Sequence, residues 1–133
     1  MKINATRFFA LWLTVFFVVL QTGCGYDGPK MTAQELKKTL EDPGHKIQVI
    51  DVRPSKLFKK GHIAGAKNYP LENLPRTSKE LAPFSGNLAI ICNRGKKSIA
   101  ALDQLTAERI SAILVEGGME QWEAAGYPVV ERR

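Results

Sequence analysis

Apolar runs alternate with segments of helical spacing through most of the chain. Runs at 47–52, 88–91 and 111–115 predict strands, and 66–69 predicts a further short strand. The run from Leu88 to Ile91 contains no polar residue, which is typical of a central strand covered on both faces. Residues 71–87 contain Pro75, Pro83 and Gly86, so we expect mostly loop there, with one helix near 78–81.

Helical segments lie between these strands. Thr32 and Glu35 have the spacing of a capping box, which predicts a helix start, and Pro43 predicts its end. Apolar residues spaced by threes predict a helix over 98–110, and 54–60 and 120–125 predict shorter helices. Strands that alternate with helices favour a parallel sheet. The expected fold class is therefore α/β: a single domain with a central, mainly parallel sheet flanked by helices on both faces.

Composition and charge narrow the range of functions. The chain has 133 residues, enough for one domain, and its net charge of +6 comes from scattered lysines and arginines. Because no motif accompanies this charge, we expect no nucleic-acid partner. There are only two cysteines and no cysteine–histidine cluster, so we expect neither a disulfide scaffold nor a metal site, and no cofactor.

Residues 1–23 differ from the remainder of the chain. Lys2 and Arg7 precede an uncharged run from Phe8 to Leu20, which has the size of a signal-peptide core and is shorter than the ~20 residues that span a bilayer. The sequence that ends in Cys24 resembles a bacterial lipoprotein processing site. In that family the cysteine becomes the lipidated first residue of the mature protein.

This resemblance implies a domain organisation and a location. We expect a signal peptide over 1–23, a short tether over 24–30 and the folded domain over 31–133. A lipid on Cys24 would anchor the protein to a membrane, on the periplasmic or cell-surface side. Gln21 departs from the lipoprotein pattern, so a simply cleaved signal peptide and an uncleaved anchor stay open as alternatives. All three place the domain outside the cytoplasm.

Cys92 directly follows the central apolar strand and is the candidate nucleophile. A helix expected to begin near Ser98 directs its unpaired N–H groups and its partial positive charge at the loop. Gly95 lets the loop fold tightly, so that successive N–H groups can point inward and favour a thiolate. The competing interpretation is a buried structural cysteine. The expected substrate-binding residues follow the cysteine: Asn93, Arg94, Gly95, Lys96, Lys97 and Ser98.

Four motifs in this order resemble those of the rhodanese family. They are Asp51-Val52-Arg53, the GHIAGA sequence at 61–66, the loop at 92–98, and Gly117-Gly118 with Trp122 and the GYPV sequence at 126–129. The resemblance runs from about residue 31 to residue 130. Each motif alone is weak, but four in order at the family's spacing are specific.

The resemblance implies a sulfurtransferase. The Cys92 thiolate would attack the outer sulfur of a small anionic donor such as thiosulfate, carry the sulfur as a persulfide, and pass it to a thiol or other thiophilic acceptor. Lys97 stands where the family often has arginine and would face the substrate, whereas Lys96 would face solvent. Asp51 and Arg53 would form a supporting pair that does not touch the substrate, and His62 would be structural.

Two other functions remain open. Phosphatases and arsenate reductases of related fold also use a loop cysteine, but they need arginine six residues later, where this chain has Ser98. A non-catalytic binding module, or a persulfide carrier for a single partner, is the second alternative.

Overall fold

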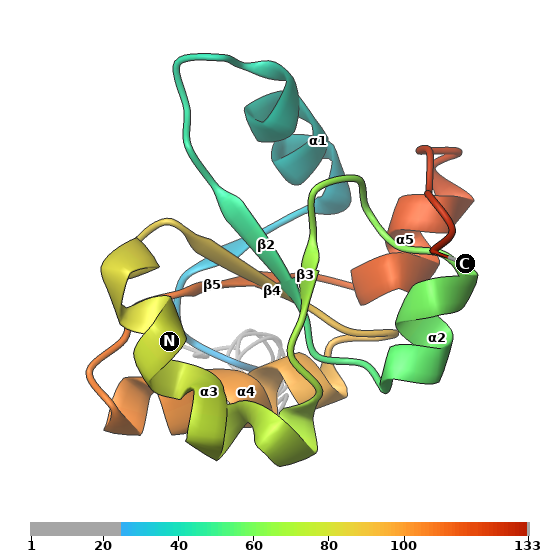
Figure 1. Cartoon of the computed structure of the whole chain (residues 1–133). Coiled ribbons are helices and arrows are strands. Elements are labelled where there is room, and N and C mark those ends of the chain that lie inside the picture. The colour runs from blue at the N-terminus through green and yellow to red at the C-terminus, as the bar shows by residue number, and fades with distance from the viewer. Residues whose placement is uncertain (1–24, 133) are drawn as a thin grey trace, which may run out of the picture.

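The protein is built around a five-stranded parallel sheet. The structure, a computed structural model, describes residues 25–132 (Figure 1). The strands are β1 (Lys30–Met31), β2 (Gln48–Asp51), β3 (Lys67–Asn68), β4 (Leu88–Ile91) and β5 (Ile113–Val115). They are ordered β1-β5-β4-β2-β3, and every pairing is parallel. The predicted strands are thus confirmed in type and approximate position.

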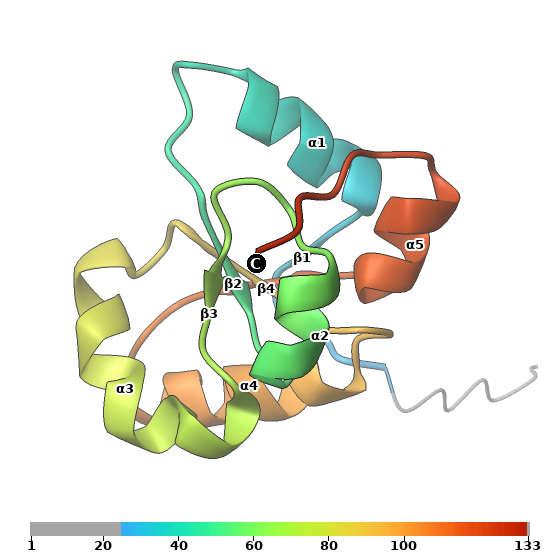
Figure 2. The same cartoon turned by 45° about the vertical axis from the view of Figure 1, so that its right-hand side comes forward.

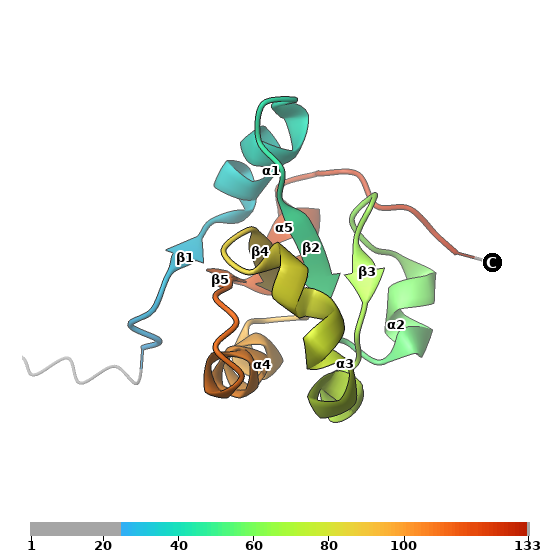
Figure 3. The ribbon, with the colours of Figure 1, turned by 60° about the vertical axis from the view of Figure 1, so that its left-hand side comes forward.

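Helices cover both faces of the sheet, as predicted. They are α1 (Ala33–Glu41), α2 (Ser55–Lys60), α3 (Leu74–Leu81), α4 (Lys96–Ala107) and α5 (Gly118–Ala124), with short 3-10 helices η1 (Leu71–Asn73) and η2 (Ala82–Phe84). Figures 2 and 3 show α1 and α5 on one side of the sheet and α3 and α4 on the other. Each side has its own apolar cluster, one around Leu36 and Trp122 and the other around Leu74 and Leu105.

The central strands place the site. All four residues of β4 are buried, which agrees with its unbroken apolar sequence. In the register between β2 and β4, Asp51 lies opposite Ile91. Cys92 and the segment that begins at Val52 therefore leave the sheet side by side at its carboxyl edge, where open parallel sheets bind their ligands.

The predicted capping box at the start of α1 is confirmed. The Glu35 amide donates to Thr32 Oγ1 at 3.2 Å, and the Thr32 amide donates to Glu35 Oε2 at 2.7 Å. The hydrogen bond from the Thr32 amide, with a further one from its hydroxyl, holds the pKa of Glu35 below its ordinary value. This box fixes the entry of the chain into α1 directly after β1.

The helix expected near 78–81 is present, but the prediction of loop for most of 71–87 was wrong: the helix begins at Leu74, and short 3-10 helices precede and follow it. Pro75 lies in the first turn of α3, where a missing N–H removes no intrahelical hydrogen bond. Leu74 and Leu81 are fully buried against the sheet, and the spacing between them is helical. Pro75 and Pro83 lie at the starts of helices, whereas we interpreted them as loop residues from the sequence.

Helix α4 begins two residues earlier than predicted. Gly95 is its N-cap, in a left-handed conformation with φ of 103°, and Lys96 is its first residue. The helix ends at Ala107, where the chain turns into β5. Lys96 and Lys97 thus belong to the first turn of the helix, where we had placed them in the loop before it.

The sheet begins inside the segment predicted as a tether. Lys30 pairs with Leu114 in β5, and Tyr26 packs against an apolar cluster of the domain. The predictions for residues 1–24, including the signal segment and Cys24, lie outside the described residues. Within residues 25–132, no helix has the length and apolar character required to cross a bilayer.

Candidate active site

The sulfur of Cys92 lies in a cradle of backbone. The residue directly follows β4, is only 2% exposed, and accepts a hydrogen bond from the Gly95 amide to Sγ at 3.0 Å. The left-handed φ of Gly95 makes this geometry accessible to glycine and costly for other residues. An amide that points at the sulfur is the arrangement expected of a loop that holds a thiolate.

A pocket of about 230 Å³ opens onto this sulfur. One wall comes from α2 and the residues before it, and the other from the loop and the first turn of α4. The residues that line it are Arg53, Pro54, Leu57, Cys92, Asn93, Arg94, Lys96 and Lys97. Lys96 was expected to face only solvent, but it lines the pocket together with Lys97.

Arg94 differs from the two lysines. Its Nε donates to the Glu120 carboxylate on α5, and its side chain is 77% exposed. Because Arg94 is paired with the Glu120 carboxylate, an anion in the pocket would meet less of the Arg94 charge than it would if the arginine were unpaired. The sequence indicated three cations around the cysteine, whereas the structure places two of them, Lys96 and Lys97, without a carboxylate partner among the described residues.

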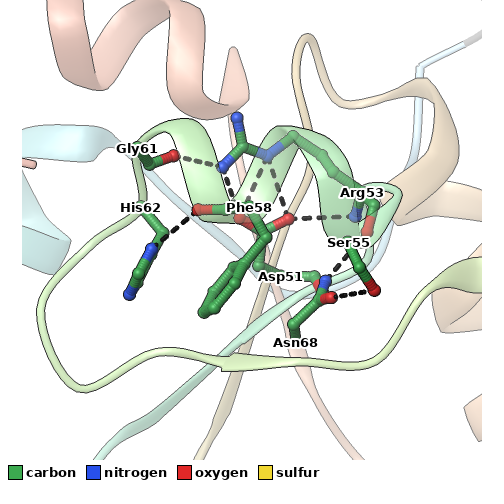
Figure 4. Close-up of polar contacts among 7 residues, drawn as sticks. All are labelled: Asp51, Arg53, Ser55, Phe58, Gly61, His62 and Asn68. Atoms are coloured by element: carbon green, nitrogen blue, oxygen red, sulfur yellow. Dashed lines mark hydrogen bonds and ion pairs between the residues drawn. The ribbon is translucent and has the colours of Figure 1, made fainter. Parts of the chain in front are cut away.

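Asp51 and Arg53 form the expected hydrogen-bonded pair, although Arg53, which was expected to lie away from the substrate, also lines the pocket. Arg53 Nη2 lies 2.6 Å from Asp51 Oδ2, Nε donates to both carboxylate oxygens at 3.0 Å, and the Arg53 amide donates to Oδ1 at 2.9 Å (Figure 4). Both side chains are buried. The pair fixes the turn between β2 and α2, and so it positions one wall of the pocket.

The same network extends along α2. Arg53 Nη2 also donates to the Gly61 carbonyl at 2.7 Å, beyond the end of the helix (Figure 4). His62 donates from Nδ1 to the Phe58 carbonyl at 2.8 Å, and the two rings stack with centroids 3.7 Å apart. His62 therefore packs against α2, in keeping with the structural role expected of it.

Sequence reasoning missed Asn68. Its Nδ2 donates to the carbonyl oxygens of Asp51 and Arg53, at 2.9 and 2.8 Å, and its Oδ1 accepts from Ser55 Oγ. The Asp51 carbonyl also accepts the Tyr69 amide, so Asn68 adds a second hydrogen bond there and ties the turn after β2 to β3. Asn68 lies beside the charged Lys67 in a short strand, so no local pattern in the sequence singled it out.

Gly118 has a role that the sequence did not reveal. The amides of Met119 and Glu120 donate to the carbonyl oxygens of Cys92 and Asn93, at 2.8 and 3.1 Å. A Cβ atom on Gly118 would lie 2.3 Å from the Cys92 oxygen, far inside van der Waals contact. The Gly117-Gly118 pair, which the sequence showed only as part of a family motif, thus brings the start of α5 against the backbone of the nucleophile.

Asn93 and Ser98, both expected to bind the substrate, differ in exposure to solvent. Asn93 is exposed at the mouth of the pocket, whereas Ser98 is fully buried in the first turn of α4. Ser98 Oγ has no hydrogen-bond partner among the described residues. Residues 25–132 also contain no group of three histidine, cysteine or carboxylate side chains placed to hold a metal ion.

A model of the Rhodanese-like domain matches residues 32–125. The chain belongs to this family. Solved structures agree: a rhodanese-related protein from Thermoplasma volcanium superposes with a TM-score of 0.70 at 30% identity, covering 79% of this chain and 100% of that one. A Rhodanese-like domain protein from Staphylococcus aureus gives a TM-score of 0.67 at 30% identity, covering 80% and 100%.

The curated relatives carry different names. Thiosulfate sulfurtransferase GlpE of Pseudomonas putida (strain GB-1) is 32% identical over 84 residues, which covers 60% of this chain and 72% of that protein. Putative sulfur carrier protein YrkF of Bacillus subtilis is 25% identical over 95 residues, covering 71% and 50%. An HTH-type transcriptional regulator of Mycobacterium tuberculosis is 34% identical over 89 residues, covering 64% and 38%. This chain therefore spans less than half the length of that regulator.

Proposed function

We propose that this protein is a sulfurtransferase that moves a sulfane sulfur through a persulfide on Cys92. The observation that carries the proposal is the hydrogen bond from the Gly95 amide to Cys92 Sγ, in a pocket that is also lined by Lys96 and Lys97. Relatives named thiosulfate sulfurtransferase and putative sulfur carrier support the same class of chemistry.

The chemistry has two half-reactions. In the first, the Cys92 thiolate attacks the outer sulfur of thiosulfate, a new S–S bond forms on the cysteine, and sulfite leaves with the electron pair of the broken S–S bond. In the second, a thiophilic acceptor takes the outer sulfur and returns the thiolate. Loop and helix N–H groups stabilise the anionic sulfur in both states, and Lys96 and Lys97 attract the dianionic donor.

Phosphate-ester hydrolysis fits this site less well. A tetrahedral phosphate needs a planar, bidentate cation at the position that Ser98 holds. Ser98 is buried and uncharged, and Arg94 is engaged by Glu120. We therefore expect no phosphatase activity that depends on Cys92.

Steady-state kinetics test the proposal. Wild-type protein with thiosulfate and cyanide as assay acceptor should release sulfite with ping-pong kinetics, and Cys92→Ser should abolish turnover. Unchanged turnover in Cys92→Ser would refute the assignment. Persulfide formation without turnover on small acceptors would favour a sulfur carrier over an enzyme. Phosphate release that needs Cys92 would favour the phosphatase.

Export is the second part of the proposed function, and it rests on the sequence of residues 1–24. The mature protein would be held at a membrane by a lipid on Cys24. Expressed in a bacterium, the protein should fractionate with membranes, and Cys24→Ala should block lipidation. A soluble, unlipidated product that starts near Cys24 would support a simple signal peptide, and a membrane-bound product that retains Met1 would support an anchor.

A further inference from the structure

We propose that the sulfur acceptor is a protein that presents a cysteine among carboxylates and docks on a basic face beside the reactive pocket. This basic face consists of Lys56, Lys59 and Lys60 on α2 and of Arg132 in the C-terminal segment. The inference rests on the proposed sulfur transfer, and it adds the class of acceptor and the surface that receives it.

The cations of the basic face have no partner that explains their position. All four are exposed, none has a carboxylate within ion-pair distance among residues 25–132, and α2 itself contains no acidic residue. Lys56 and Lys60 lie one turn apart on the same side of the helix and repel each other. Lys56 also lies in the first turn, where the partial positive charge of the helix disfavours a cation. An anionic partner would relieve both effects.

The basic face adjoins the pocket that contains Cys92. Leu57 on the same helix lines that pocket, so a partner bound along α2 lies directly beside its mouth. Because α2 joins β2 to β3, it lies toward the edge of the sheet opposite β1. Figure 3 shows α2 and the C-terminal segment on one side of the molecule and β1 on the other. A membrane attachment at Cys24, a few residues before β1, would leave the basic face at the far side of the domain, which favours a protein partner over a lipid surface.

Apolar side chains border the basic face. Val129 and Val130 are 40% and 41% exposed in the segment that runs beside α2. Val130 exchanges two backbone hydrogen bonds with His62, at 2.8 and 3.0 Å. The Arg132 amide donates to the Lys59 carbonyl at 3.0 Å, so the segment is held against the helix. Neighbouring apolar side chains rimmed by charged ones are typical of protein–protein contacts, and a preformed surface binds without first ordering the chain.

The pocket restricts the acceptor to a slender group. Cys92 is 2% exposed, and the pocket that opens onto it has a volume of about 230 Å³. A cysteine that projects from a protein surface fits this space, and carboxylates around it would then meet the basic face. Its thiolate attacks the protonated outer sulfur of the Cys92 persulfide, forms a new S–S bond, and breaks the bond between that sulfur and Sγ. The electron pair of the broken bond returns to Cys92 as the thiolate, the acceptor becomes the persulfide, and no oxidant or reductant takes part.

Single-turnover transfer to two synthetic peptides tests the proposal in the full-length protein. Each peptide contains one cysteine, flanked by glutamates in one and by glutamines in the other, and Cys92 is loaded beforehand with thiosulfate. The rates are corrected for the reactivity of each peptide thiol with iodoacetamide. We expect the wild type to pass sulfur to the glutamate peptide about tenfold faster at low ionic strength, and the two rates to converge at high salt.

The double variant Lys56→Gln with Lys60→Gln should slow transfer to the glutamate peptide about fivefold. Transfer to the glutamine peptide and loading by thiosulfate should change less than about twofold, because neither lysine lines the pocket. Arg76→Gln with Lys79→Gln is the matched control, since it removes two exposed cations one turn apart on α3, and it should change each rate less than about twofold. Lys56→Glu with Lys60→Glu should make a lysine-flanked peptide the better acceptor.

Equal rates with the two peptides, or equal losses in the double variant and its control, would overturn the inference. If the double variant then also binds phosphatidylserine vesicles more weakly than the wild type, the basic face belongs to a lipid surface. Failure of thiosulfate to load Cys92 would instead refute the proposed function. In that case binding of a glutamate peptide with serine in place of its cysteine decides the docking surface. Its affinity should fall about fivefold in the double variant and not in the control, and equal affinities would overturn the inference.

Discussion

The backbone of Cys92 is packed against Gly118 so closely that no side chain fits between them. A Cβ atom on Gly118 would lie 2.3 Å from the Cys92 carbonyl oxygen and 2.7 Å from that of Asn93. The same carbonyl of Cys92 accepts the Met119 amide at 2.8 Å. The first turn of α5 therefore holds the chain directly after the nucleophile, and the orientation of the reactive loop depends on a glycine far along the sequence.

Gly118→Ala should displace the reactive loop. The left-handed φ of 58° at this position adds strain to the steric clash, so we expect a loss of about 2–4 kcal/mol in the free energy of unfolding and a fall of tenfold or more in kcat/KM. Gly126→Ala is the matched control, with φ of 73° and open space around the added atom. It should cost only about 1–2 kcal/mol and leave kcat/KM unchanged. Equal activity losses in the two variants would contradict a specific role of Gly118 in positioning the reactive loop.

Arg53→Met should leave a buried, unpaired carboxylate at Asp51. We expect the free energy of unfolding in urea to fall by about 3–5 kcal/mol, because the Asp51 charge loses its partner in the interior. The double variant Asp51→Asn with Arg53→Met should recover part of the loss. Arg76→Met, on the exposed face of α3, serves as the control. A loss below about 1 kcal/mol would show that the pair is dispensable.

Lys96→Ala and Lys97→Ala should both weaken the use of thiosulfate, because both lysines line the pocket. From the sequence, Lys97 was expected to contribute much more than Lys96. We expect kcat/KM to fall roughly three- to tenfold for each at low ionic strength, and less at high salt, since both side chains are exposed. Lys97→Arg should keep or improve thiosulfate use, because its planar fork suits a sulfonate group. Wild-type kinetics in both alanine variants would leave the backbone cradle as the sole anion-binding element.

Glu120→Gln should increase the use of anionic donors. The change releases Arg94 from its ion pair and adds a free cation beside the pocket. We expect kcat/KM for thiosulfate to rise about two- to threefold at low salt, the scale of an exposed charge, and the gain to vanish at high salt. Glu123→Gln removes the same charge from an exposed position on the same helix. A similar gain in both variants would indicate a general charge effect rather than release of Arg94.

The sheet was predictable because its strands differ from the helices in pattern. Leu88 to Ile91 is apolar throughout, and that run fixed the position of the central strand and of Cys92 after it. Only the second half of helix α3 was predicted, because Pro75 signals a helix start and a loop equally well, and only the burial of Leu74 and Leu81 decides between them. Proline is ambiguous until its place in the helix is known.

The candidate site was predicted in its residue types more fully than in its contacts. Asp51 and Arg53 were expected to pair and do so, since two residues at this spacing after a strand lie close together. The engagement of Arg94 by Glu120 and the contact of Gly118 with Cys92 join residues about 26 positions apart, which local patterns do not report. Such contacts depend on how α5 docks at the edge of the sheet.

The most direct measurement of the central claim is the intact mass of the protein after incubation with thiosulfate. The account predicts that wild-type protein gains one sulfur atom, that a reductant removes it, and that fragmentation places it on Cys92. Cys92→Ser should show no gain under the same conditions. A wild-type mass that does not change, or a Cys92→Ser protein that gains the same sulfur, would contradict sulfur transfer through Cys92.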